Sequence, residues 1–300
     1  MATNRTVSIL LLTLVFVADP LLDRLFASPV PSIKRSKSDR DISAIGHRDI
    51  MREPDRKFIG SPEKERERAA AWAAEIERST KVTHDPSLTG YLAALAQNIA
   101  RNSDAQLPIT VTLLDSDEVN SCTSPGGYQY VTRGLLVQLE SEGELAALLA
   151  HGIAHTALHS PTIQGIRQVL MQVPGVSPVQ KSAFTWFTCT SPRLFNGMLL
   201  TDEFDADYFG VQYVYKAGYD VDSYIRFVQR IWAAPLSASG IDVLAFDRFP
   251  PTSERVKALH HEIADILPER GEATVSTSAF EEFEGKRHSN RILVSKAVLW

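Results

Sequence analysis

Apolar residues recur at intervals of three and four along most of the chain, and this spacing predicts helices. The clearest run covers residues 143–158, where Leu145, Leu149 and Ile153 share one face, so a buried amphipathic helix is expected there. Further helices are expected to begin at Pro62, after a capping serine, and to span residues 86–102, 163–172, 202–216, 220–232 and 253–267.

Two short segments depart from the helical period. Residues 109–115, ITVTLLD, and residues 128–131, YQYV, are rich in β-branched and aromatic side chains, which predicts strands. Between them, Pro125-Gly126-Gly127 predicts a turn. The chain is therefore expected to adopt an α+β fold that is mostly helical and contains a small sheet.

The N-terminal part has a different pattern. Arg5 precedes an uncharged apolar run over residues 7–18, and LFAS at residues 25–28 fits a cleavage site, as is typical of an export signal. The run is shorter than the ~20 residues of a relaxed membrane span, which favours a signal peptide over a retained anchor. We therefore expect an exported protein of the periplasm or cell envelope, with membrane anchoring through this run as the alternative.

Residues 29–60 are polar and rich in Lys, Arg, Asp and Ser, without a sustained apolar period. This composition predicts a flexible leader. A solvated spacer is the favoured interpretation, and peripheral contact of its basic residues with anionic lipid is the other. The expected organisation is a signal peptide (1–28), a leader (29–60), a folded domain (61–285) and a C-terminal tail (286–300).

Composition narrows the class of protein only a little. The chain has 300 residues, of which 44% are hydrophobic and 22% charged, as in a globular protein with one large core or two small ones. A net charge of -5 gives no support for a nucleic-acid partner. Cys122 and Cys189 could pair in an oxidising compartment, but two thiols do not make a disulfide scaffold, and their pairing stays open.

The candidate chemistry lies in LLAHGIAHTALH, residues 148–159. His151 and His155 stand four apart, which places two imidazoles on one helix face, as zinc binding requires. Such a pair alone is more often a coincidence. The segment TDEFDADYFG adds Glu203 and Asp207, which also share a helix face. An acidic first turn that interacts with the helix dipole would explain Glu203 well and Asp207 poorly.

The order of these segments resembles that of the HtpX-like and CAAX-prenyl-endopeptidase-like zinc metallopeptidases, metallopeptidase family forty-eight. The resemblance rests on four blocks, DSDEVNSCTSPGGYQYVTRGLL, GELAALLAHGIAH, EFDADYFGVQYVYKAGYD and FPPTSERVKALHHEIADILPE. It covers roughly residues 61–283. It implies a zincin-like metallopeptidase domain with an active-site helix, whose substrates are unfolded or membrane-derived polypeptides.

The resemblance also implies roles for individual residues. His151, His155 and Glu203 would bind one zinc ion per chain and leave a fourth position for water. Asp207 would accept a hydrogen bond that orients a ligand imidazole. The substrate would add as a strand beside an edge segment, which comprises Asn120, Ser121, Cys122, Thr123 and Ser124.

Gly152 departs from the family pattern, because members have at this position a glutamate that takes a proton from zinc-bound water. A positioned general acid/base contributes about 10²–10⁴ in rate, and glycine has no group for this task. We expect the Gly152 Cα to face the open side of the metal site and Gly152→Glu to raise activity. Phe249 is a second departure, since a histidine is expected there.

Two functions therefore stay open. The first is an exported zinc metalloendopeptidase of the protein-quality-control type, with severely reduced activity. The second is a zinc-binding pseudo-peptidase that binds polypeptides without cleaving them.

Overall fold

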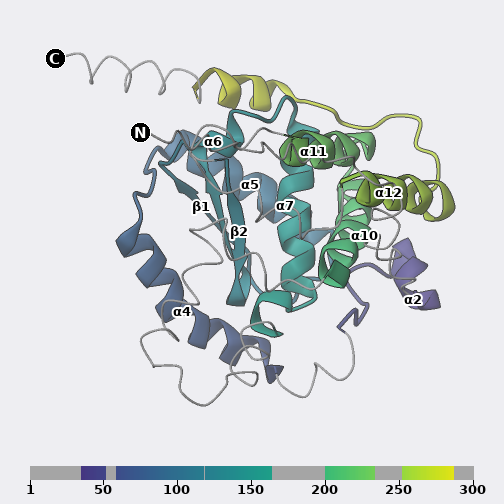
Figure 1. Ribbon diagram of the computed structural model, residues 1–300, viewed down its shortest axis with the longest axis horizontal. Coiled ribbons are helices and arrows are strands. Elements are labelled where there is room, and N and C mark those ends of the chain that lie inside the picture. The colour runs from purple at the N-terminus through teal and green to yellow at the C-terminus, as the bar shows by residue number, and fades with distance from the viewer. Residues whose placement is uncertain (1–34, 52–58, 118, 164–199, 234–251, 287–300) are drawn as a thin grey trace, which may run out of the picture. The chain divides into compact units, whose positions relative to one another are not determined.

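The computed structural model describes residues 35–51, 59–117, 119–163, 200–233 and 252–286 (Figure 1). Most of them are helical, in the long helices α4 (Pro62–Ser79), α5 (Pro86–Arg101), α7 (Glu142–Ala157), α10 (Leu200–Lys216), α11 (Asp222–Ala233) and α12 (Thr252–Ile266). Shorter helical segments are α2 (Lys37–Arg40), η1 (Ile42–Ala44), η2 (Pro125–Gly127) and α6 (Arg133–Leu136). The strands are β1 (Thr110–Leu114), β2 (Ser121–Ser124) and β3 (Tyr128–Thr132). The expected α+β, mostly helical fold is confirmed.

Local capping chemistry explains where the helices begin. Ser61 Oγ accepts a hydrogen bond from the Lys64 backbone N–H at the start of α4, and Asp85 Oδ1 accepts one from Ser87 at the start of α5. Ser141 caps α7 in the same way, because its Oγ accepts the Glu144 N–H at 3.2 Å. Each cap satisfies a backbone donor that has no partner inside the helix.

The sheet has the strand order β1-β3-β2. β1 runs parallel to β3, whereas β2 and β3 are antiparallel and joined by the predicted turn, which is η2. Thr123 on β2 lies directly opposite Gln129 on β3. This register matters for the site, since paired residues point to the same face of a sheet.

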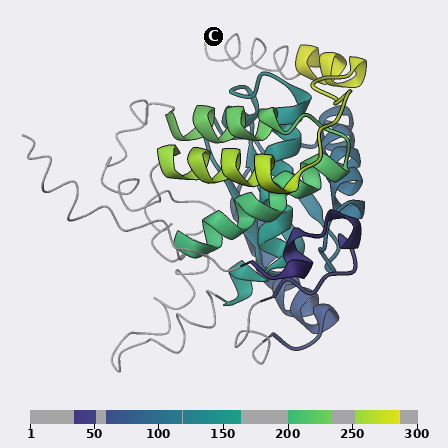
Figure 2. The ribbon, with the colours of Figure 1, turned by 90° about the vertical axis from the view of Figure 1, so that its right-hand side faces the viewer.

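Helix α7 runs between the sheet and the helices α10 and α11 (Figure 1). Its alanine and glycine residues let neighbouring elements approach closely, and Leu145, Leu149 and Ile153 are fully buried. Helix α4 packs elsewhere on the sheet, where Ile76 meets Leu114 and Tyr130. Figure 2 shows α11 and α12 side by side, with α10 below them. The chain thus places its histidine-bearing helix at the centre of the core.

Residues 35–51 are packed against the domain, although they fall in the predicted flexible leader. Ile45 and Ile50 belong to the main hydrophobic core. The Arg48 side chain is 0% exposed, donates a 2.6 Å hydrogen bond to Asp104 and donates another to Gln212. The prediction of a solvated segment rested on polar composition alone. Composition gives no information on distant residues that neutralise the charges of a segment, and the prediction was therefore wrong for these residues. The domain boundaries themselves stay predictions.

Several expectations fall outside the described residues. They concern the signal peptide (1–28), nearly all of the expected helix over 163–172, Phe249, Cys189 and nearly all of the C-terminal tail (286–300). Cys122, which is described, is disulfide-bonded. Within the described ranges, every helix is too short or too polar to cross a membrane.

Candidate metal centre

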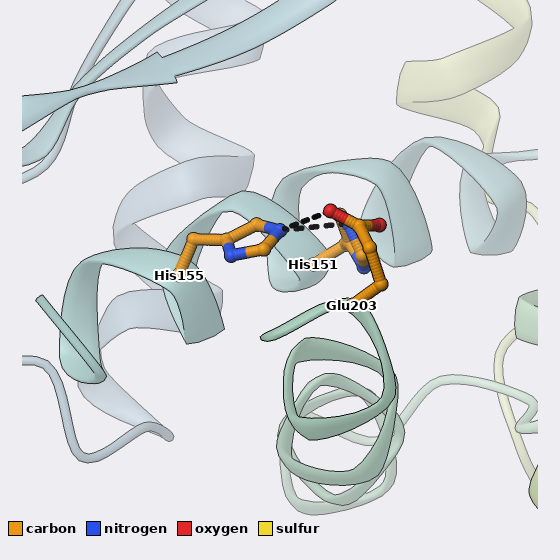
Figure 3. Close-up of side chains that lie close together, drawn as sticks. All are labelled: His151, His155 and Glu203. Carbon is orange, nitrogen blue, oxygen red and sulfur yellow. Dashed lines mark hydrogen bonds and ion pairs between the residues drawn. The ribbon is translucent and has the colours of Figure 1, made fainter. Parts of the chain in front are cut away.

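His151 and His155 from α7 converge with Glu203 from the first turn of α10 (Figure 3). The Nε2 atoms of the two histidines are 3.1 Å apart. Glu203 Oε2 lies 3.4 Å from His151 Nε2, and Glu203 Oε1 lies 3.4 Å from His155 Nε2. The His151 side chain is 16% exposed and the other two are 4% exposed, so solvent reaches the cluster at His151.

These separations fit a zinc ion. In a roughly tetrahedral zinc site with bonds of about 2.0–2.2 Å, neighbouring donor atoms lie about 3.3–3.6 Å apart. The separations of 3.1, 3.4 and 3.4 Å are close to this range, although the last two end on different oxygens of Glu203. Two imidazole nitrogens and one carboxylate oxygen are also the donor types of zinc sites that keep one open position. The three residues therefore meet both the distance and the chemical requirements of this metal.

A second group of side chains fixes the orientation of His151. Asp207 Oδ1 lies 3.1 Å from His151 Nδ1, and the Tyr224 hydroxyl lies 3.1 Å from the same nitrogen. Arg255 donates from Nε and Nη2 to the two oxygens of Asp207, at 2.6 and 2.7 Å. When His151 Nδ1–H donates to Asp207, Nε2 carries no proton, and its lone pair is available for a metal ion.

The buried carboxylates are held in their charged form. Burial by itself would raise the pKa of Asp207, but the charge of Arg255 and the hydrogen bond with His151 outweigh it and lower that pKa. Burial would likewise raise the pKa of Glu203, whose hydrogen bonds with His151 and His155 hold it well below its usual value. Burial, together with nearby Asp207, raises the pKa of Tyr224, which stays a neutral hydroxyl. Glu203 is therefore available as an anionic ligand beside the two histidines, and the charge of Asp207 is compensated by Arg255.

Sequence reasoning missed Arg255 and Tyr224. Arg255 lies four residues before Leu259, which is fully buried, so the two residues share the buried face of α12. This spacing was the sequence feature that could have indicated a buried arginine. The Tyr224 hydroxyl approaches α10 closely because residue 210 is glycine. A Cβ at Gly210 would lie 2.6 Å from that oxygen.

The predicted substrate-binding segment forms β2 and the residue before it. Within the described sheet, β2 pairs only with β3, so its other edge has no partner strand among these residues. Asn120 is held by Thr132, whose Oγ1 accepts the Asn120 N–H at 3.0 Å. Ser121, Cys122, Thr123 and Ser124 follow as the strand, which contacts α7. This placement is compatible with strand addition, and the substrate-binding role stays a prediction.

Gly152 faces the sheet, and the expectation that its Cα faces the open side of the metal site stays a prediction. A Cβ on Gly152 would lie 2.7 Å from Thr123 Oγ1 and 2.9 Å from both Cδ and Nε2 of Gln129. The reason is helical geometry, because each residue turns by about 100° and position 152 therefore points to the flank of the metal-facing stripe. The fold brings β2 and the Gln129 side chain of β3 against that flank.

Fold and site together define a metallopeptidase domain. Residues 86–263 match the model of Peptidase family M48. This match covers more than half of the chain, and the chain belongs to this family.

Several curated relatives of the chain are named as beta-barrel assembly-enhancing proteases. The chain is 26% identical over 175 residues to the putative beta-barrel assembly-enhancing protease of Vibrio cholerae, and 24% identical over 177 residues to the beta-barrel assembly-enhancing protease of Yersinia pestis. It is 22% identical over 174 residues to the protease of that name in Escherichia coli. The alignments cover 54%, 53% and 53% of this chain, respectively, and 36% of each relative. The chain thus spans little more than a third of these relatives.

Glu262 on α12 gives a prediction about pH. Burial raises its pKa to about 8, against the attraction of Arg35 and with a contribution from Asp207. From its unfolded pKa near 4.5 up to about 8, the folded chain retains a proton that the unfolded chain releases, so stability falls as pH rises through this window. We expect Glu262→Gln to raise the free energy of unfolding at pH 8 by on the order of 1–3 kcal/mol, with little effect at pH 4.

Urea unfolding of both proteins at pH 4 and pH 8 measures this difference. Asp265→Asn is the matched control, because Asp265 lies on the same helix and its side chain is 46% exposed. A gain for Glu262→Gln that is the same at both pH values would contradict the buried, protonated carboxyl.

Proposed function

We propose that this chain is a zinc-binding member of Peptidase family M48 whose capacity for peptide-bond hydrolysis is severely reduced. The observation that carries the proposal is the convergence of His151, His155 and Glu203, with donor separations that suit one zinc ion. When bound there, zinc would polarise a peptide carbonyl and lower the pKa of water. The family membership of the domain supports the same reading.

The surrounding residues hold the site but provide no evident base. Asp207 and Arg255 orient His151, and Glu203 contributes a negative charge. Gly152, at the position that the resemblance assigns to the general base, has no side chain that could accept a proton. Glu144 on the same helix precedes His151 by seven residues, or about 10 Å, and accepts hydrogen bonds from Arg230.

The second candidate function is a pseudo-peptidase, which would bind zinc and polypeptides without cleaving them. It is favoured by the side chains of Thr123 and Gln129, which fill the space beside Gly152. Both candidates share the metal, the domain and the strand β2 as a surface for an extended polypeptide.

We propose unfolded or membrane-derived polypeptides as the ligands, in a role of protein quality control at the cell envelope. The names of the relatives, which refer to β-barrel assembly, support this class. The apolar run at residues 7–18 supports export, either with cleavage or with retention as an anchor. Peripheral association with the membrane through the basic leader belongs to the same proposal.

Incubation of the zinc-loaded protein with β-casein, an unfolded polypeptide, tests the two candidates. We expect cleavage far slower than the ~1–10³ per second typical of enzymes, and none in a His151→Ala/His155→Ala variant. Binding without any cleavage would select the pseudo-peptidase. A typical enzymatic rate, abolished by a chelator, would show that another group supplies the base. A protein that neither binds nor cleaves would contradict both candidates.

A further inference from the structure

Two side chains from neighbouring strands occupy the space beside Gly152. Thr123 on β2 and Gln129 on β3 are directly opposed in the antiparallel ladder, so their side chains share the sheet face that meets α7. Thr123 Oγ1 and the Gln129 amide both lie within 3 Å of the point where a Cβ of residue 152 would stand, at 2.7 and 2.9 Å. We call these two residues the Thr123–Gln129 pair.

The amide of Gln129 is buried without a hydrogen-bond partner. The residue is 3% exposed, and its Nε2 atom makes no hydrogen bond within the part of the chain that the structure describes. An unpaired buried amide lowers stability, and an apolar side chain of similar size would fill the same volume without that loss. Packing alone therefore does not account for glutamine at this position.

The chemistry of the pair differs from that of a carboxylate. A hydroxyl and a neutral amide can hold an oxygen atom by donating hydrogen bonds, but neither takes a proton from water at neutral pH. A glutamate on α7 would need the volume that the pair now fills, because contacts under 3.0 Å to a Cβ force a neighbour to move. Gln129 has little room to do so, since it is almost wholly buried.

We propose that the Thr123–Gln129 pair occupies the general-base position of the site and replaces proton transfer there by hydrogen-bond donation. The proposal rests on the proposed function and deepens it by naming the residues that close position 152. A carboxylate at position 152 alone is then insufficient to restore catalysis. The pair must be removed as well.

A mutant cycle based on Tm tests whether the Thr123–Gln129 pair occupies the space beside Gly152, and it requires neither metal nor substrate. Gly152→Ala is expected to lower the Tm by about 3–10 °C, because the added methyl group collides with both members of the pair. In a Thr123→Ala/Gln129→Ala background the same substitution should lose no stability, since the space is empty. Gly90→Ala is the matched control. Gly90 is inside helix α5 with nothing within 4 Å of its Cβ, so this variant should gain about 1–4 °C.

Equal losses from Gly152→Ala in both backgrounds, or no loss in the wild-type background, would overturn the proposal. The cycle compares the change in Tm that Gly152→Ala causes in each background. A lower Tm of the Thr123→Ala/Gln129→Ala background itself therefore does not affect the conclusion.

The activity test uses β-casein cleavage at matched zinc content. Gly152→Glu in the Thr123→Ala/Gln129→Ala background should exceed Gly152→Glu alone at least tenfold, and the gain over wild type should lie within the ~10²–10⁴ range of general acid/base catalysis. A single Gly152→Glu variant that equals the triple variant would overturn the proposal. If neither variant gains activity while the mutant cycle behaves as expected, the occupancy of the space beside Gly152 stands and the proposed hydrolytic function of the site fails.

Discussion

Replacing His151 and His155 together with alanine is expected to abolish stoichiometric zinc binding. Wild-type protein purified without a chelator should retain roughly one zinc ion per chain, held by two imidazoles and the Glu203 carboxylate. The double variant keeps only the carboxylate, which cannot hold zinc alone. Elemental analysis of both proteins gives the result directly, and added zinc should raise the Tm of wild type only.

Two further variants sharpen this experiment. His260→Ala/His261→Ala removes two exposed histidines from α12 and should leave the zinc content unchanged. Asp207→Asn removes the carboxylate that contacts His151 Nδ1 and should weaken zinc binding by about 10–100-fold. Unchanged zinc in the His151→Ala/His155→Ala variant would refute the site.

The second large effect is expected for Arg255→Met. The Arg255 guanidinium is 1% exposed and pairs with Asp207 at 2.6 Å and with Glu203 at 3.3 Å. Removing it leaves two buried carboxylates without their cation, and breaking such a buried pair typically destabilises a protein by about 3–5 kcal/mol. Urea unfolding in the presence of a chelator measures this loss without a contribution from zinc.

Lys257→Met is the matched control, because Lys257 lies on the same helix with a 73% exposed side chain paired to Glu254. Its loss should stay below about 1 kcal/mol. Adding Asp207→Asn to Arg255→Met should recover part of the stability, since one of the uncompensated charges disappears. A loss for Arg255→Met as small as that for Lys257→Met would show that the buried pair contributes little.

The helices and the three converging residues could be predicted because the information is local. A cap such as Ser61 or Asp85 acts within a few residues, and the four-residue spacing of His151 and His155 fixes their common face on any helix. Glu203 lies on a separate acidic helix, α10. Its grouping with the two histidines was predicted from the resemblance to the zinc metallopeptidases. The expected bounds of the helices lie close to the observed ones for the same reason.

The surroundings of the site could not be predicted in this way. Arg255 and Tyr224 reach Asp207 only because α12 packs beside α10, and α11 packs against α7 and α12. The contact of Gln129 with Gly152 depends on the register between β2 and β3 and on the docking of the sheet against α7. Such contacts join residues far apart in sequence, and periodicity in one segment carries no information about them.

The burial of Arg48 limits how far the N-terminal part of the chain can be shortened without a loss of stability. Asp104 accepts hydrogen bonds from the Gly46 N–H and from the Arg48 guanidinium, both upstream of α4. A cut before residue 35 leaves these donors in place. A cut after Arg48 removes both of them and leaves a buried carboxylate whose remaining described donor is the Tyr213 hydroxyl. A chain shortened beyond Arg48 is therefore expected to be less stable than one that keeps residues 35–51.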